Sequence, residues 1–319
     1  MSRPPQVVGE TAPGEVRVAG LAFRNPIVLA SGTAGFGREI ADVVDLDAVG
    51  GLSTKAVSVA PRAGNPALRV SEFAGGMINA VGLANPGLDA VQAEWLPWLP
   101  ANHPGTRVFV NVVGNSIDDF AAIVGRLTGE RGVDAFELNV SCPNVKAGGL
   151  EFGADPVALR ALVGAARAAT DRPLFVKLSP TLGVGIVETA RVAVEAGATG
   201  LTLVNTLPGL VIDTASRRPK LSFGSGGVSG PALLPAGLLA TWRVHQALPE
   251  VPLIGLGGVS SGDEAVQYLM AGASLVGVGT AALRDPRAPE RIARELAAWC
   301  RKAGVRDLST LIGSLQWPT

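Results

Sequence analysis

The chain has 319 residues, 47% of them hydrophobic, which is enough for one large α/β barrel or for two average domains. Its 27 basic and 27 acidic residues balance, so charge favours neither nucleic acid nor an anionic membrane as a partner. Two cysteines and two histidines exclude a disulfide framework and an iron–sulfur cluster, leave little for zinc, and suit a reducing cytoplasm. No apolar run approaches the ~20 residues of a membrane span, and the first residues lack the apolar core of a signal peptide.

Apolar patterning predicts a barrel built from strand–helix units. Residues 15–24 alternate apolar and polar side chains around Gly20, which indicates a β-hairpin that closes the bottom of the barrel. Continuous apolar runs then recur, as is typical of parallel strands buried on both faces. The predicted strands are 25–31, 49–57, 107–114, 135–141, 173–179, 199–206, 251–259 and 273–280. Apolar residues at helical spacing predict helices at 118–127, 155–170, 185–197 and 262–272.

Eight such units in a chain of this length predict a (β/α)8 barrel, the TIM barrel. No linker marks a second domain, so residues 1–319 are expected to form a single domain. The connections 58–106 and 207–250, after the second and sixth predicted strands, are too long for simple links. They are rich in Gly, Pro and polar residues, and long segments of this kind are usually lids or binding loops.

Polar residues gather at the carboxyl ends of six predicted strands, where this fold builds its active sites. They are Ser31, Lys55, Asn111, Asn139, Lys177 and Asn205. Capping of the following helices would account for the serine and the asparagines. It does not account for Lys55 and Lys177, because lysines are poor caps and are costly to bury without a partner. The chain otherwise uses arginine for its positive charge, with 22 arginines against five lysines.

Glycines follow the last two predicted strands. Gly257–Gly258 precede a capping-box pattern formed by Ser261 and Glu264, and Gly279–Thr280 close the last strand. Free N–H groups after strands seven and eight are the usual phosphate site of such barrels, although simple tight turns would also use glycine. We therefore expect a phosphorylated ligand, and the amides above it suit a heterocycle with N–H and C=O groups.

Several motifs, in order along the chain, give a specific resemblance. They are NPIVLASGTAGFG, NAVGLANPG, NVVG, ELNVSCPNVKAGG, FVKLSP, VNTL, GGVSGPA, IGLGGV and VGTA, and they span about residues 25–282. The chain resembles dihydroorotate dehydrogenase, and specifically its class 1B catalytic subunit. The resemblance implies an FMN-containing barrel that oxidises (S)-dihydroorotate to orotate in pyrimidine (UMP) biosynthesis.

The same resemblance assigns three catalytic residues. Cys142, in the SCPN motif, is implied as the base that takes a proton from one substrate carbon while a hydride leaves its neighbour for the flavin. A thiol with a reference pKa of ~8.5 can be tuned for this task, although an isolated cysteine is as often a small buried hydrophobe. Lys177 is implied at the flavin pyrimidine edge and Lys55 between the flavin and the substrate carboxylate. Cys300, on a late amphipathic helix, is interpreted as a plain core residue.

The remaining site residues are also carried over from the motifs. The residues implied to bind FMN are Ser31, Lys55, Ala56, Asn111, Asn139, Lys177, Val204, Gly230, Gly257, Gly258, Gly279 and Thr280. Those implied to bind the substrate are Lys55, Asn79, Ala80, Val81, Gly82, Leu83, Asn139, Asn205 and Thr206. Val81 and Leu83 fit plain loop packing equally well. No metal site is expected.

The form SCPNVKAGG resembles class 1B, which passes electrons to NAD+ through a partner subunit carrying FAD and a [2Fe–2S] cluster. A homodimer within a heterotetramer is implied, without nucleic acid or membrane. The quinone-linked class uses serine as base. The open alternatives are the fumarate-linked class 1A, a dihydropyrimidine dehydrogenase-like flavin barrel, which has His in place of Asn144, a barrel aldolase using Lys177, and a non-catalytic flavin- or phosphate-binding subunit.

Overall fold

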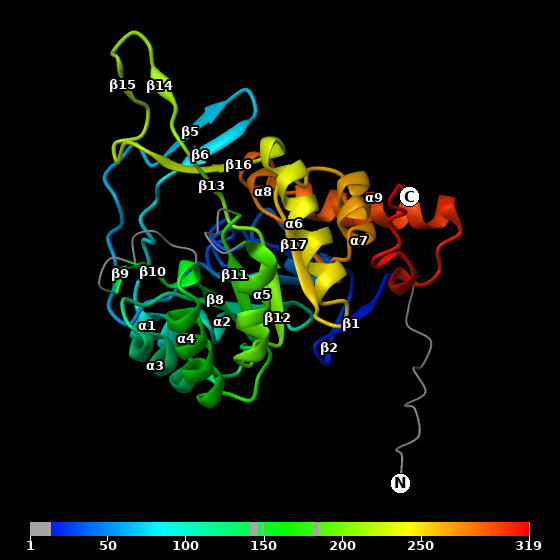
Figure 1. Cartoon of the computed structure of the whole chain (residues 1–319), viewed down its shortest axis with the longest axis horizontal. Helices are drawn as coiled ribbons and strands as arrows, with labels where there is room; N and C mark the ends of the chain where they lie inside the picture. The colour runs from blue at the N-terminus through cyan, green and yellow to red at the C-terminus, as the bar shows by residue number, and fades with distance from the viewer. Residues whose placement is uncertain (1–13, 141–145, 148–149, 181–184, 319) are drawn as a thin grey trace.

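The computed structural model describes residues 14–140, 146–147, 150–180 and 185–318 (Figure 1). Eight parallel strands form a closed barrel, in the order β11-β12-β17-β18-β3-β4-β7-β8. They are β3 (Ile27–Leu29), β4 (Gly51–Ser53), β7 (Arg107–Val112), β8 (Ala135–Asn139), β11 (Leu174–Leu178), β12 (Gly200–Leu203), β17 (Leu253–Leu256) and β18 (Leu275–Val278). Each lies inside one of the predicted strands, which confirms the (β/α)8 barrel.

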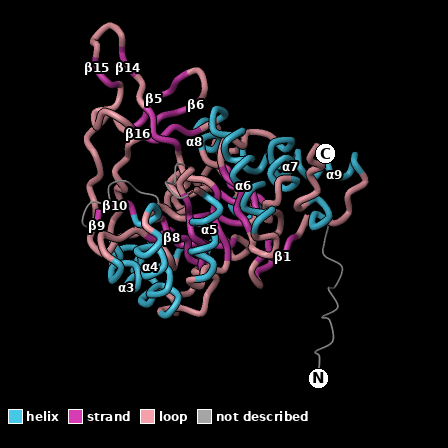
Figure 2. The backbone as a smooth tube through the Cα atoms, in the orientation of Figure 1, coloured by secondary structure: helices cyan, strands magenta, loops and turns pink. Residues whose placement is uncertain are grey.

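Helices cover the outside of the barrel, as Figure 2 shows. They are α3 (Ile117–Leu127), α4 (Pro156–Ala168), α5 (Ile186–Glu195), α6 (Leu234–Ala247), α7 (Gly262–Met270), α8 (Thr280–Arg284) and α9 (Ala288–Ala303). The four predicted helices are confirmed, whereas α6 lies inside the connection 207–250. Between β3 and β4 the described backbone forms only the short 3-10 helix η1 (Leu46–Ala48).

Side-chain caps set the start of several helices. Asp155 accepts hydrogen bonds from the backbone of α4, directly before Pro156 at its first position. Ser261 Oγ accepts from Glu264 N at the start of α7, as the capping box predicts. The reciprocal bond differs from the prediction: the Glu264 carboxylate accepts from Ser260 N at 2.6 Å.

The predicted hairpin consists of β1 (Val16–Val18) and β2 (Leu21–Phe23). Ala19 and Gly20 form its turn with positive φ angles of 52° and 81°. The ring of Phe23 stacks on Phe109 at 6.0 Å, and Phe109 meets Phe175 edge to face at 5.3 Å. The hairpin therefore closes the amino-terminal end of the barrel with an apolar layer, as predicted.

The two long connections pair with each other. Strands β5 (Val70–Phe73) and β6 (Gly76–Asn79) come from the first connection, and β13 (Leu207–Gly209) and β16 (Gly226–Ser229) from the second. They form one antiparallel sheet in the order β13-β16-β6-β5, which we call the upper sheet. Because the connections follow β4 and β12, the upper sheet covers the carboxyl ends of the barrel strands (Figure 1).

The shorter elements complete the description. A hairpin of β14 (Ile212–Asp213) and β15 (Arg218–Pro219) projects beyond the upper sheet (Figure 2). The others are α1 (Leu88–Ala90), the π-helix η2 (Val91–Trp95), α2 (Trp98–Asn102), β9 (Lys146–Ala147), β10 (Leu150–Glu151), η3 (Phe152–Ala154), η4 (Pro231–Leu233) and η5 (Leu308–Leu311). Across the described ranges, every helix is too short or too polar to cross a membrane.

Candidate active site

A cavity of about 580 Å³ lies between the carboxyl ends of the barrel strands and the upper sheet. Its volume falls within the range of roughly 300–1,000 Å³ that is usual for small-molecule sites. The predicted site residues that line it are Ser31, Lys55, Ala56, Asn79, Ala80, Val81, Gly82, Leu83, Asn139, Lys177, Val204, Asn205, Thr206, Gly230, Gly257, Gly258, Gly279 and Thr280. Residues far apart in the sequence are thus brought to one cavity.

Two predicted residues are not among the described walls of the cavity. Cys142 lies outside the described residues. Asn111 is fully buried in β7, where its Nδ2 donates a 2.6 Å hydrogen bond to Glu137. Its Oδ1 is buried and has no hydrogen-bond partner among the described residues. Such an acceptor is costly to leave unpaired, and it suits the ring N–H of a bound heterocycle.

The two lysines differ in their surroundings. Lys177 is 5% exposed, and its Nζ lies 3.9 Å from a carboxylate oxygen of Glu137. This neighbour supplies the partner that burial of a lysine requires. Lys55 is half-buried on the cavity wall, and its backbone N–H donates to Gly35 at 2.7 Å. Within the described part of the chain, no carboxylate lies within 4.0 Å of its ammonium, so Lys55 gives the cavity positive charge.

Glu137 is a buried residue just below the cavity, and the sequence analysis did not identify it. It is 2% exposed, although it lies inside the apolar strand β8. Its carboxylate accepts hydrogen bonds from Ser53, Asn111 and Thr202, at 2.8, 2.6 and 2.8 Å. The sequence did contain a sign of this residue, because Glu137 is the single charged residue in the apolar run AFELN. A charged side chain is rarely buried in a strand unless it is paired.

The predicted glycine turn lies on the cavity wall. Gly257 and Gly258 have φ angles of 130° and 79°, which favour glycine. The hydroxyl of Tyr268 donates to the Gly257 carbonyl at 2.8 Å, and burial raises the pKa of this phenol, so it stays a neutral donor. Nearby, the hydroxyl of Thr280 donates to Ser229 on the upper sheet at 2.8 Å. The Gly257 carbonyl is therefore held in place at the cavity wall, and the phosphate site stays a prediction.

Amide side chains are fixed on the other wall. Asn205 Nδ2 donates to Asn139 Oδ1 at 3.4 Å, and its own Oδ1 accepts from Thr206 N at 2.8 Å. Asn79 Nδ2 donates to the Gly227 carbonyl at 3.2 Å, which ties β6 to β16. The hydroxyl of Ser31 donates to the Thr54 carbonyl, so this serine joins two strand ends and caps no helix. These amides offer donors and acceptors in set directions.

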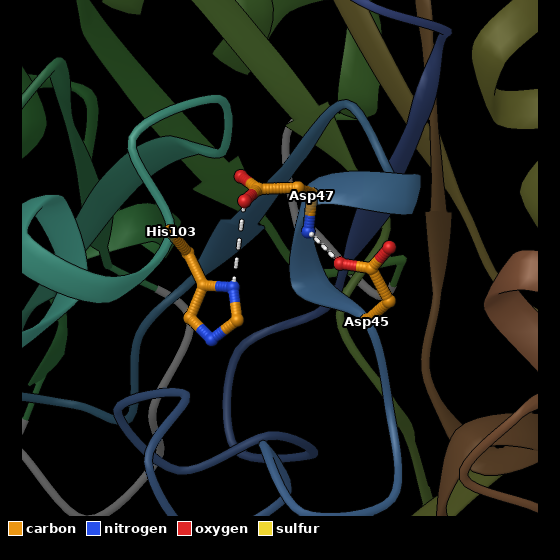
Figure 3. A group of neighbouring side chains, drawn as sticks. All are labelled: Asp45, Asp47 and His103. Atoms are coloured by element: carbon orange, nitrogen blue, oxygen red, sulfur yellow. Dashed lines mark hydrogen bonds and ion pairs between the residues drawn. The ribbon is translucent and has the colours of Figure 1, made fainter.

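The described ranges contain one group of side chains with metal-ligand chemistry, which Figure 3 draws. None of its members lines the cavity. Asp45, Asp47 and His103 precede β4 and β7, at the amino-terminal end of the barrel. Asp47 accepts from Gly105 N at 2.9 Å and from Thr106 Oγ1 at 3.2 Å, and lies 3.6 Å from His103 Nδ1. These contacts join the loop before β4 to the loop before β7, which gives the group a structural role.

Comparison with known proteins decides the family. The family model described as dihydroorotate dehydrogenase matches residues 14–299. The chain belongs to the dihydroorotate dehydrogenase family. Relatives named "Dihydroorotate dehydrogenase B (NAD(+)), catalytic subunit" include those of Pelobacter propionicus, at 46% identity, and Geobacter sp. strain M21, at 44%. Each alignment covers 94% of this chain, with 98% and 97% of the respective relative.

Membership in the dihydroorotate dehydrogenase family agrees with the architecture. A relative from Geotalea uraniireducens with the same name is 45% identical over 300 residues, which cover 94% of this chain and 97% of the relative. The matched region includes all eight barrel strands and both connections that form the upper sheet. The resemblance drawn from the sequence motifs is therefore confirmed at the level of the family and of the barrel.

Proposed function

We propose that this chain is the catalytic subunit of an NAD+-linked dihydroorotate dehydrogenase, which oxidises (S)-dihydroorotate to orotate. The family supports this proposal, as do the printed names of relatives at 44–46% identity. The observation that carries it is the cavity: residues implied for the cofactor and for the substrate meet around one space of about 580 Å³. A barrel aldolase or a plain binding subunit would not need both sets together.

We propose FMN as the cofactor held in this cavity. The residues present fit it, since the buried Asn111 Oδ1 has no partner among the described residues and suits a ring N–H. The Lys177 ammonium suits a ring edge that gains negative charge, and the backbone at Gly257–Gly258 and Gly279–Thr280 suits a phosphate. When bound, FMN supplies the acceptor for the hydride that leaves the substrate.

The chain's own residues would prepare the substrate. Lys55 would pair with its carboxylate, and Asn79, Asn139 and Asn205 would hold its ring amides in one orientation. Cys142 is proposed as the base that takes the proton from the neighbouring carbon. The upper sheet covers this space, so it would exclude water from the weak carbon acid and its base.

The electron route and the assembly belong to the same proposal. A partner subunit carrying FAD and a [2Fe–2S] cluster would take electrons onward to NAD+, in line with the words "catalytic subunit" in the relatives' names. A homodimer within a heterotetramer, a single domain over residues 1–319 and a cytoplasmic location stay predictions.

An anaerobic titration tests the function. The purified chain should show a flavin absorption spectrum, which dihydroorotate should bleach. The bleached protein alone should be reoxidised slowly by NAD+, and the partner subunit should restore fast reoxidation. Fast reoxidation by fumarate would overturn the NAD+ link, whereas a flavin that dihydroorotate leaves oxidised would overturn the substrate. A protein that stays colourless after incubation with FMN would overturn the flavoenzyme proposal.

A further inference from the structure

Glu137 gathers polar side chains from four other strands at the centre of the barrel. Its Oε1 accepts from Ser53 in β4 and Asn111 in β7, and its Oε2 accepts from Thr202 in β12. Lys177 in β11 brings its Nζ to 3.9 Å from the same Oε1. The parallel register explains this meeting, because Asn111 pairs with Glu137 and Lys177 with both Asn139 and Thr202.

Stability alone is a poor reason for this arrangement. The layer beneath is apolar and aromatic, formed by Phe109 and Phe175, and the same packing could have continued upward. A buried ion pair is often no more stabilising than apolar residues of similar volume, because both charges lose their hydration. The Glu137 carboxylate instead has its hydrogen bonds satisfied, at the level just below the cavity. This location suggests a task in the cavity above.

Two of the four partners of Glu137, Asn111 and Lys177, are groups implied to contact a bound flavin ring. Lys177 lines the cavity, and Asn111 directs one amide atom to Glu137 while its Oδ1 has no partner in the described structure. Because Nδ2 is held by the carboxylate, Oδ1 is oriented as an acceptor. The Glu137 charge also offsets the Lys177 charge at short range.

We propose that Glu137 is a positioning residue that orients Asn111 and Lys177 and sets the charge beneath the flavin. This inference rests on the proposed function, and in particular on FMN as the ligand. A reduced flavin that carries negative charge is stabilised by the ammonium and opposed by the carboxylate. Glu137 therefore holds the reduction potential of bound FMN below the value that Lys177 alone would give.

The substitution Glu137→Gln tests the charge with little change of shape. Its oxygen can still accept from Asn111, and its NH2 can donate to Thr202, whose hydroxyl serves as donor or acceptor. The matched control is Thr202→Val, which removes one hydrogen bond to the same carboxylate and leaves the charge. FMN affinity and melting temperature would be measured for both variants, so that loss of fold is seen separately.

The decisive measurement is the midpoint potential of bound FMN, obtained by anaerobic reduction with dithionite against a reference dye. Glu137→Gln should raise the ratio of reduced to oxidised flavin at a fixed potential by at least about tenfold, which is about 30 mV for a two-electron couple. Thr202→Val should keep the wild-type potential. An unchanged potential in a folded, FMN-loaded Glu137→Gln variant would overturn the proposal and leave Glu137 a purely structural residue.

A second pair of variants keeps the test open if Glu137→Gln does not fold. Lys177→Met and the double variant Glu137→Gln/Lys177→Met differ only in the carboxylate charge, and the double variant buries no unpaired ion. The double variant should have the higher potential, and equal potentials would overturn the proposal. A wild-type chain that binds no FMN would overturn both this inference and the proposed function. If dithionite reduces the bound flavin and dihydroorotate does not, only the proposal that dihydroorotate is the substrate would be overturned.

Discussion

The hydroxyl of Tyr268 donates a 2.8 Å hydrogen bond to the carbonyl oxygen of Gly257, across the link between α7 and the glycine turn of the cavity. Tyr268 is the chain's single tyrosine, and its side chain is fully buried. The ring packs so closely that a methyl group on Gly255 would come within 2.3 Å of it. The buried Tyr268 side chain thus holds the backbone at Gly257–Gly258, where we propose that the FMN phosphate binds.

Tyr268→Phe should destabilise the protein and weaken FMN binding. The ring packing is kept, but the buried Gly257 carbonyl loses its donor, which costs about 1–3 kcal/mol. Urea unfolding would measure the change in the free energy of unfolding, and flavin fluorescence the change in FMN affinity. An unchanged unfolding free energy would show that the hydrogen bond contributes nothing.

Alkaline pH should remove stability through the same residue. Burial raises the pKa of Tyr268 above its ordinary value of 10.0, so the folded state favours the neutral phenol. Its contribution is complete below about pH 10 and falls at higher pH, by up to about 1.4 kcal/mol per pH unit, because the unfolded chain then loses the proton first. Urea unfolding between pH 8 and 11 should show a shallower alkaline decline in Tyr268→Phe than in the wild type. Parallel curves would contradict this assignment.

Cys142→Ser should slow reduction of the flavin by dihydroorotate by about 10²–10⁴-fold, because a hydroxyl is a far weaker base than a thiol that can ionise. FMN content should stay close to that of the wild type. Stopped-flow absorbance under anaerobic conditions would measure the rate. Reduction at the wild-type rate would remove Cys142 from the role of base.

The two cysteines should differ in reactivity toward a thiol reagent. Cys300 is buried in α9, and burial raises the pKa of its thiol, so little thiolate is present near neutral pH. We expect labelling of the folded chain to be confined to Cys142 and to be lost in Cys142→Ser. Mass spectrometry of the labelled peptides would check this, with the urea-unfolded chain as the control in which both cysteines react. Fast labelling of Cys300 in the folded protein would contradict its burial.

Asp47→Ala should lower the free energy of unfolding by about 1–3 kcal/mol and leave FMN affinity unchanged. The carboxylate holds Gly105 N and Thr106 Oγ1 at the amino-terminal end of the barrel, away from the cavity. Asp47→Asn keeps an acceptor oxygen and should cost less. Urea unfolding would measure the change in stability, and flavin fluorescence would measure FMN affinity. A loss of FMN affinity in Asp47→Ala would contradict the prediction that this end of the barrel does not affect the cavity.

Local pattern predicted much of this protein. Apolar periodicity predicted the barrel strands, four helices and the hairpin of β1 and β2. An element that is buried on one or both faces has apolar residues at a regular spacing in the sequence. Motifs at the strand ends predicted part of the cavity wall, because all carboxyl ends of a closed parallel barrel face one side. Helix α6 was not identified, and its hydrophobic pattern is weak because Gly237, Ala240, Thr241 and Val244 form its buried face.

Motifs and apolar patterns were enough to predict the family, the barrel and the candidate site residues. Which of these side chains come together depends on long-range packing. Closure of the barrel brings Ser53, Asn111, Lys177 and Thr202 around Glu137, although they are spread over four other strands. It also places Asn111 beneath the cavity and joins the two long connections into the upper sheet. These contacts are long-range pairings, and no local pattern records a partner that lies 65 or 148 residues away.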